Sequence, residues 1–175
     1  ACSRTAAQLE QLMSLRDSMC SAMKQAMLYQ DLSGGVMSSV ATMVSEIFSD
    51  ETQISAVALS QCSSVLTSAI EDAPAFACQP SLTGLQVGTS LSRLLGAGSL
   101  VGTDLLSNVS RAVTFLTAGC QAHLANGETP FTVAAEHLRL STRIGDATEI
   151  VNYTQPSAQS EHEQRSDSPI SSATV

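Results

Sequence analysis

The chain has 175 residues, of which 43% are hydrophobic, and its 16 acidic and eight basic side chains give a formal net charge of -8 at pH 7. This acidity, together with basic residues scattered singly along the chain and the absence of Trp, excludes nucleic acid as an expected partner. No apolar run approaches the roughly 20 residues that cross a bilayer, so we expect no membrane span in this chain. The first residue is Ala1 rather than Met, which suggests a processed chain or a piece of a longer one.

Five amphipathic helices are predicted, because apolar residues recur at spacings of three and four over the first 125 residues. They are expected at residues 5–30, 36–48, 51–71, 82–95 and 100–125. The stripe of the first helix is expected to fill the core rather than to bind a partner, and it consists of Leu9, Leu12, Met13, Met19, Cys20, Met23 and Met27. In the fourth, Gly84 and Gly88 either allow a neighbour to approach closely or weaken the helix, and the sequence leaves both alternatives open.

Glycine and proline mark the expected breaks between helices. Gly34 and Gly35 are expected to follow the end of the first helix, since paired glycines are costly inside a helix. Pro74 and Pro80 predict a loop over residues 72–81, because proline does not fit a helix interior.

The segment that follows residue 128 has a different pattern. Residues 137–144 alternate polar and apolar side chains, which predicts a half-buried strand. Residues 131–135 and 149–153 are its candidate neighbours, and the apolar parity shifts between residues 133 and 138, which requires either a bulge or two strands. Residues 155–175 have almost no apolar content and are predicted to be a flexible polar tail.

The expected fold is therefore mainly α: a bundle of about five amphipathic helices followed by a small antiparallel β element that is an incomplete sandwich. The predicted units are a helical part over residues 1–128, the β element over 129–154 and the tail over 155–175. The apolar face of so small a sheet should lie on the helices, and its edge should pair with strands from other protein segments or chains, as part of a larger assembly. The predicted pairing edge consists of His137, Leu138, Arg139, Leu140, Ser141, Thr142, Arg143 and Ile144.

The five cysteines indicate an oxidising compartment. They show no C-x-x-C pair and no histidine at metal-ligand spacing, so we expect no metal and no cofactor. Disulfides are expected instead, and the candidates are Cys2, Cys20, Cys62, Cys78 and Cys120. The preferred pair is Cys62 with Cys120, since both lie on inward stripes, while Cys20 and Cys78 remain alternative partners. The odd number leaves one thiol free or bonded outside the chain.

Two N-x-S/T triplets, at Asn108 and Asn152, are candidate glycosylation sites. With the disulfides and a Ser/Thr-rich surface that carries few charges, they favour an extracellular or cell-surface location.

No catalytic residue is predicted. The only histidines are His123, His137 and His162, and each is expected at the surface. No G-x-S-x-G elbow surrounds a serine, and the glycine-containing segment at residues 94–104 lacks the lysine of a phosphate loop.

The order of these elements resembles a known family. Successive amphipathic helices lead into a T-P-x-x-V…L-x-L strand, and "FLTAGCQAHLANGETPFTVAAEHLRLSTRI" is similar to the stretch where the helical subdomain of GAIN modules, as in polycystin and receptor-for-egg-jelly proteins, enters its β-sandwich. The resemblance covers residues 36–154 and implies a non-catalytic structural or interaction module of a cell-surface glycoprotein. The family's self-cleavage tripeptide, His-Leu-Ser/Thr, is not matched, because His123-Leu124 precedes Ala125 and His137-Leu138 precedes Arg139.

A second resemblance gives an alternative function. The segment "ALSQCSSVL", residues 58–66, is similar to the A-L-x-x-C segment of plant invertase and pectin-methylesterase inhibitors. These are secreted, disulfide-linked helical bundles, so this resemblance implies an inhibitor. It does not explain the strand.

Overall fold

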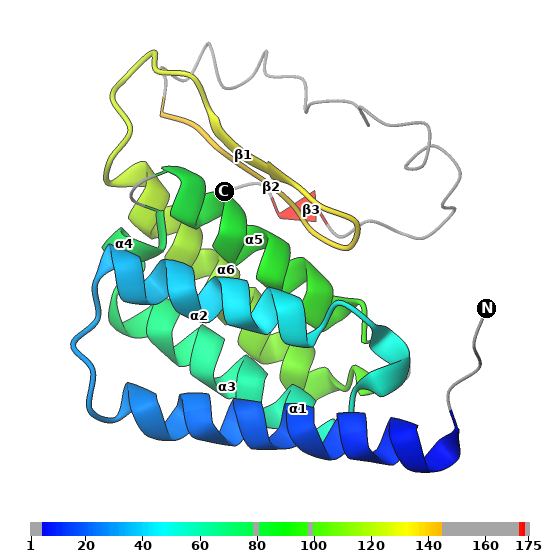
Figure 1. The fold of residues 1–175 in the computed structure, drawn as a ribbon. Coiled ribbons are helices and arrows are strands. Elements are labelled where there is room, and N and C mark those ends of the chain that lie inside the picture. The colour runs from blue at the N-terminus through cyan, green and yellow to red at the C-terminus, as the bar shows by residue number, and fades with distance from the viewer. Residues whose placement is uncertain (1–4, 79–80, 98–99, 145–171, 174–175) are drawn as a thin grey trace.

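The computed structural model describes residues 5–78, 81–97, 100–144 and 172–173. Within them, the predicted fold class is confirmed: a helical bundle is followed by a small β element (Figure 1). The helices are α1 (Ala6–Met27), α2 (Gly34–Ile47), the 3-10 turn η1 (Glu51–Gln53), α3 (Ala56–Asp72), α4 (Pro74–Cys78), α5 (Ser81–Leu95) and α6 (Thr103–Gln121). The strands are β1 (Phe131–Ala134), β2 (Arg139–Thr142) and β3 (Ser172–Ala173).

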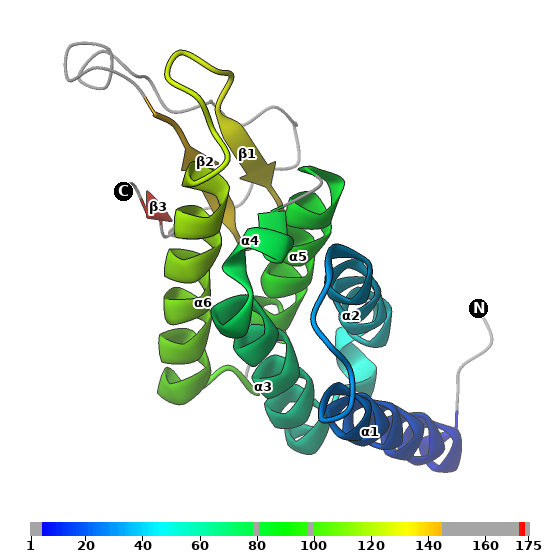
Figure 2. The ribbon, with the colours of Figure 1, turned by 90° about the vertical axis from the view of Figure 1, so that its left-hand side faces the viewer.

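The elements stack in layers. The sheet lies over α5 and α6, which in turn lie on α2 and α3, and α1 packs against α3 on the far side of the molecule from the sheet (Figures 1 and 2). The core runs through these layers, and its largest fully buried side chains include Met37, Leu66, Ile70, Leu91, Leu94 and Leu116. The periodic stripes of α2, α3, α5 and α6 thus meet along one axis of the bundle, as amphipathic helices do.

Two predicted helix starts are wrong, for reasons of capping. Gly34 and Gly35 do not end the first helix but open α2, where the Oγ of Ser33 accepts a hydrogen bond from Val36 N–H at 3.3 Å. The third helix begins at Ala56 rather than at residue 51, because Ser55 is its N-cap and accepts from Ala58 N–H at 2.9 Å. Residues 51–53 form the separate turn η1.

The predicted loop at residues 72–81 contains the short helix α4. Pro74 is the first residue of this helix, a position where the missing N–H would have had no intrahelical partner. Proline therefore starts a helix here, and the prediction failed because it considered only helix interiors.

Most of the predicted core stripe of the first helix does not lie in the core. Only Cys20 and Met23 are buried in α1, Met19 is 43% exposed, and the remaining members of the stripe are half-buried. The reason is position: α1 is the outermost helix, and its N-terminal half extends beyond the other helices (Figure 1).

The disulfides connect helices in a pattern that differs from the preferred pairing. Cys20 of α1 is bonded to Cys62 of α3, with a Cα–Cα distance of 5.0 Å, and Cys78 of α4 to Cys120 of α6, with 5.2 Å. The expected pair Cys62–Cys120 is therefore wrong. The fifth cysteine, Cys2, lies outside the described residues.

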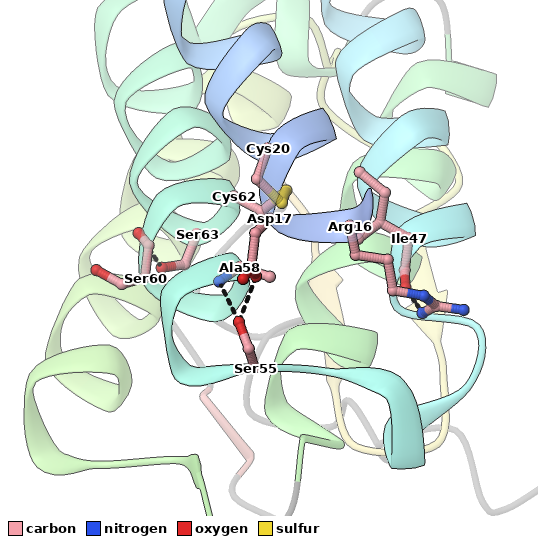
Figure 3. Close-up of a disulfide and its surroundings, with 9 residues drawn as sticks. All are labelled: Arg16, Asp17, Cys20, Ile47, Ser55, Ala58, Ser60, Cys62 and Ser63. Atoms are coloured by element: carbon pink, nitrogen blue, oxygen red, sulfur yellow. Dashed lines mark hydrogen bonds between the residues drawn. A yellow bond between two sulfur atoms is a disulfide. The ribbon is translucent and has the colours of Figure 1, made fainter. Parts of the chain in front are cut away.

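Polar contacts beside the first disulfide fix α1 to the bundle (Figure 3). The guanidinium of Arg16 donates to the carbonyl oxygen of Ile47, at the C-terminus of α2, and to the Oε1 of Gln53 at 3.0 Å. Asp17 accepts a hydrogen bond from the Oγ of Ser55, the cap of α3. A cation at the C-terminus of α2 complements the partial negative charge of that helix end.

Replacing Arg16 with Met is expected to lower the free energy of unfolding by about 2 kcal/mol, because hydrogen bonds from a charged donor to carbonyl groups are lost while the apolar stem is kept. Thermal or urea denaturation measures the change. Lys24→Met is the matched control, since Lys24 is an exposed cation on the same helix. Equal stability of the two variants would contradict a structural role for Arg16.

No helix in the described part of the chain combines the length and the apolar character that a membrane span needs.

Candidate functional site

The predicted pairing segment forms a hairpin with the strand before it. β1 and β2 are antiparallel, with Phe131 opposite Thr142 and Val133 opposite Leu140. The Ala135 N–H closes the turn by donating to the carbonyl oxygen of Leu138 at 2.9 Å. The parity shift noted in the sequence is therefore a break into two strands rather than a bulge.

The apolar face of this hairpin lies on the helices, as predicted. Val133, Leu138 and Leu140 are buried, and β1 contacts α5 while β2 contacts α6. Figure 2 shows both strands along one side of these two helices. The small sheet thus has the helix cover that strands of this length need for stability.

Two glycines of α5 explain how closely the hairpin approaches. A Cβ built at Gly84 would lie 2.7 Å from the Cζ of Phe131, and one built at Gly88 would lie 2.5 Å from a methyl group of Val133. A real Cβ almost never makes carbon contacts this short, so a side chain at either position would force the hairpin or its side chains to shift. Of the two alternatives left open by the sequence, close approach is the one that the structure supports.

The hairpin turn is anchored by residues that the sequence did not single out. The His137 N–H donates to the Oγ of Ser92 at 2.9 Å, and Ser92 is a buried residue of α5. The Gly96 position, at the end of α5, leaves room for the His137 ring and the Glu51 carboxylate, each of which would lie 2.9 Å from a Cβ there. A serine on the inward face of a helix has no distinctive spacing, so the sequence carried no signal for this contact.

The predicted pairing edge is the central strand of the described sheet. The strand order is β1-β2-β3, and β3 runs parallel to β2 with Ser172 opposite Arg139 and Ala173 opposite Leu140. One partner of the edge therefore comes from residues 172–173 of the same chain, within the segment predicted to be a flexible tail. The other candidate neighbour, 149–153, lies outside the described residues.

The ends of the predicted edge segment do not belong to the strand. His137 and Leu138 form the hairpin turn, and β2 ends at Thr142, so that Arg143 and Ile144 follow it. The polar–apolar alternation in the sequence extends beyond β2 because the turn residues before the strand and the two residues after it continue the same alternation by chance.

On the side of β2 opposite β3, the outermost strand of the described sheet is β1. Because Ala135 donates toward β2 and antiparallel pairs alternate, the N–H groups of Thr132 and Ala134 point away from β2. Their side chains lie on the face that is turned away from the helices, where the Thr132 and Ser141 hydroxyl groups are 3.4 Å apart. An edge with outward main-chain donors can accept a further strand by main-chain hydrogen bonding.

Other parts of the described surface offer less chemistry. His123 and His137 are exposed, and the His137 ring lies 3.9 Å from the carboxylate of its exposed neighbour Glu136. Neither histidine is thus enclosed with a carboxylate in the way that acid–base catalysis uses. His162 lies outside the described residues. No three His, Cys, Asp or Glu side chains of the described segments are grouped so that they could hold a metal ion.

A surface groove of about 430 Å³ lies between the end of α1, the segment after it and α3. Apolar residues such as Met27 and Val65 line it together with the charged residues Lys24, Asp31 and Asp72. Its lining contains no histidine and no cysteine.

The glycosylation candidates fall in different parts of the chain. Asn108 lies in α6 with a partly exposed side chain, followed by the exposed Ser110. Asn152 lies outside the described residues. Glycosylation at both sites stays a prediction.

Comparisons with protein-family models, with curated proteins and with solved structures find no match to this chain.

Proposed function

We propose that this chain is a non-catalytic interaction module from the extracellular part of a larger cell-surface glycoprotein, similar to the helical part of GAIN modules. In this proposal its sheet is continued by strands from another segment or another chain. The observation that carries the proposal is that the described sheet is firmly docked on the helices while its outer strand β1 points two main-chain donors away from β2.

The packing of the hairpin on α5 and the outward main-chain donors of β1 support the proposal in two separate ways. The glycines of α5 hold the hairpin against the bundle, and Ser92 fixes its turn, so the position of the sheet is set before any partner binds. The described strands, however, have only four, four and two residues, and β1 directs two main-chain donors outward. A preorganised edge of this kind binds a strand at little entropic cost.

The two disulfides support the extracellular location. Cys20, Cys62 and Cys120 are almost fully buried and Cys78 is 6% exposed, so both bonds are structural rather than exchangeable at the surface. Bonds of this type persist in secreted and cell-surface proteins and are rare in reducing compartments.

Amide hydrogen exchange tests the sheet edge. In the isolated chain, the Thr132 and Ala134 amides should exchange rapidly, while those of Val133 and Ala135 are protected by β2. In the longer protein that the proposal requires, the first two should slow by about 100-fold or more, as amides do on entering a stable ladder. Unchanged exchange at both positions would contradict the proposal.

A proline variant provides the matched mutational test. Ala134→Pro removes the outward donor, and the preceding Val133 is already extended, as a residue before proline prefers. The variant should keep the helical bundle but lose the added strand, whereas Ala134→Ser should keep both. Tight binding of the isolated chain to a carbohydrate-active enzyme, unaffected by Ala134→Pro, would favour the inhibitor-like alternative instead.

A further inference from the structure

Helix α1 carries two adjacent stripes of mainly apolar residues, of which one packs on the bundle and the other is mostly exposed. The inner stripe repeats at spacings of four and three and includes Arg16, which bonds to α2 and η1, Cys20, which is bonded to α3, and the buried Met23. The outer stripe repeats at spacings of three and four and consists of Leu12, Leu15, Met19, Ala22 and Ala26. Leu12 is half-buried, Leu15 is 56% exposed, Met19 is 43% exposed, and both alanines are exposed.

A repeat of three and four residues is the spacing by which one helix packs along another. The position of α1 leaves room for such a partner, since it lies at the periphery of the bundle, with its N-terminal half extending past the other helices (Figures 1 and 2). The outer stripe is therefore an unpartnered helix-pairing surface among the described elements.

The order of residue sizes along the outer stripe fits a second copy of α1 as its partner. Large side chains occupy its first half and alanines its second half, with Met19 at the centre. If a second α1 lies antiparallel, Leu12 faces Ala26 of the other copy, Leu15 faces Ala22, and Met19 faces Met19. Each large side chain then meets a small one, which fills the interface evenly. A parallel pair would place leucine against leucine and leave alanine opposite alanine.

The charges of α1 do not oppose a second copy at this stripe. Its four charged residues are Glu10, Arg16, Asp17 and Lys24, and none belongs to the outer stripe. Arg16 and Asp17 are bonded to the bundle, and the residues that border the outer stripe on its free side, Gln11, Ser18 and Gln25, are uncharged. Two copies that each carry a net charge of -8 can therefore meet here without placing like charges in contact.

We propose that two copies of this chain associate through antiparallel pairing of their α1 helices about a two-fold axis at Met19. Such an isologous contact closes on itself and yields a dimer. The stripe is about 21 Å long and each helix is about 10 Å wide, so the contact buries only roughly 500 Å² in total. This is below the 1,000 Å² or so of stable interfaces, so the dimer is weak and forms at high local concentration.

Cysteine cross-linking in a Cys2→Ser background tests the arrangement, because it traps weak contacts and leaves the engineered thiol as the fifth cysteine. Met19→Cys should form a disulfide dimer about tenfold faster than Ser21→Cys, since paired thiols meet at millimolar effective concentration. Ser21 is the control because it is exposed on another face of the same helix. Equal rates for the two variants would overturn the proposal.

The orientation is tested separately. A mixture of Leu15→Cys and Ala22→Cys chains should cross-link to each other faster than either chain links to itself, and faster self-linking of Leu15→Cys would overturn the antiparallel arrangement. Cross-linking of Met19→Cys should strengthen as salt is raised, because screening reduces repulsion between the acidic copies. Unchanged circular dichroism of each variant shows that the fold is kept.

Discussion

Replacing both Cys78 and Cys120 with alanine is expected to lower the free energy of unfolding by about 4 kcal/mol at 25 °C. This disulfide closes a loop with a sequence separation of 42 residues, and the loss of its constraint on the unfolded chain gives a cost of this size. A domain has only about 5–15 kcal/mol of stability in total, so the reduction is large. Urea denaturation measures it.

The variant with both Cys20 and Cys62 replaced should lose a similar amount, because its loop has the same separation of 42 residues. The two loops do not overlap along the chain, so the two costs should add approximately. The two double variants should differ, however, in the region where amide exchange increases. Since α1 buries only Cys20 and Met23, loss of its disulfide should speed amide exchange in α1 first.

Peptide mapping without reduction provides the direct check of the pairing. Peptides that join Cys20 to Cys62 and Cys78 to Cys120 are expected. A peptide that joins Cys62 to Cys120 would contradict the structure, and unchanged stability of either alanine pair would contradict the stabilising role of that bond.

The wrong cysteine pairing shows what helix periodicity leaves undetermined. The stripes of α3 and α6 placed Cys62 and Cys120 toward the core, and both are indeed buried. A stripe defines the inward face of a helix, but not which neighbouring helix each inward side chain meets. Here Cys62 meets α1 and Cys120 meets α4, and α4 was not predicted as a helix.

The same reasoning explains why the α1 prediction was only partly correct. Helix α1 exists because Thr5 and Gln8 form a capping box and few helix breakers follow. Its apolar residues form two stripes that periodicity alone merges into one broad face. Only the packing of α1 at the edge of the bundle separates the residues that contact α3 from those that face solvent.

The sequence predicted that the sheet is antiparallel and that its apolar face lies on the helices, because the alternation of polar and apolar residues fixes which face is buried. Its third strand was not, since Ser172 and Ala173 have no apolar pattern and pair through their backbones. The anchoring Ser92 was missed for a related reason: a single hydroxyl group on a helix has no periodicity.

Replacing Gly88 with Leu is expected to lower the free energy of unfolding by about 3 kcal/mol, because it forces a large side chain into a filled site. A Cβ at this position would already lie within 3.1 Å of three Val133 atoms, and Val133 is 2% exposed. Val133 is β-branched and held in the β1–β2 ladder, so it cannot turn aside. The hairpin must therefore lift from α5, or α5 must shift.

The positions at which amide protection is lost distinguish local displacement of the hairpin from a general loss of stability. Amides of β1 and β2 should lose protection, while α3 and α6 should keep theirs, because their disulfides and core contacts lie away from Gly88. Gly35→Ala in α2 is the control, since its new Cβ would meet only the Ser33 Oγ, at 4.0 Å, and alanine suits a helix better than glycine. That variant should be as stable as the original chain or slightly more stable. If Gly88→Leu behaved like Gly35→Ala, the close approach of β1 to α5 could not be what positions the sheet, and the proposed docking edge would lose its support.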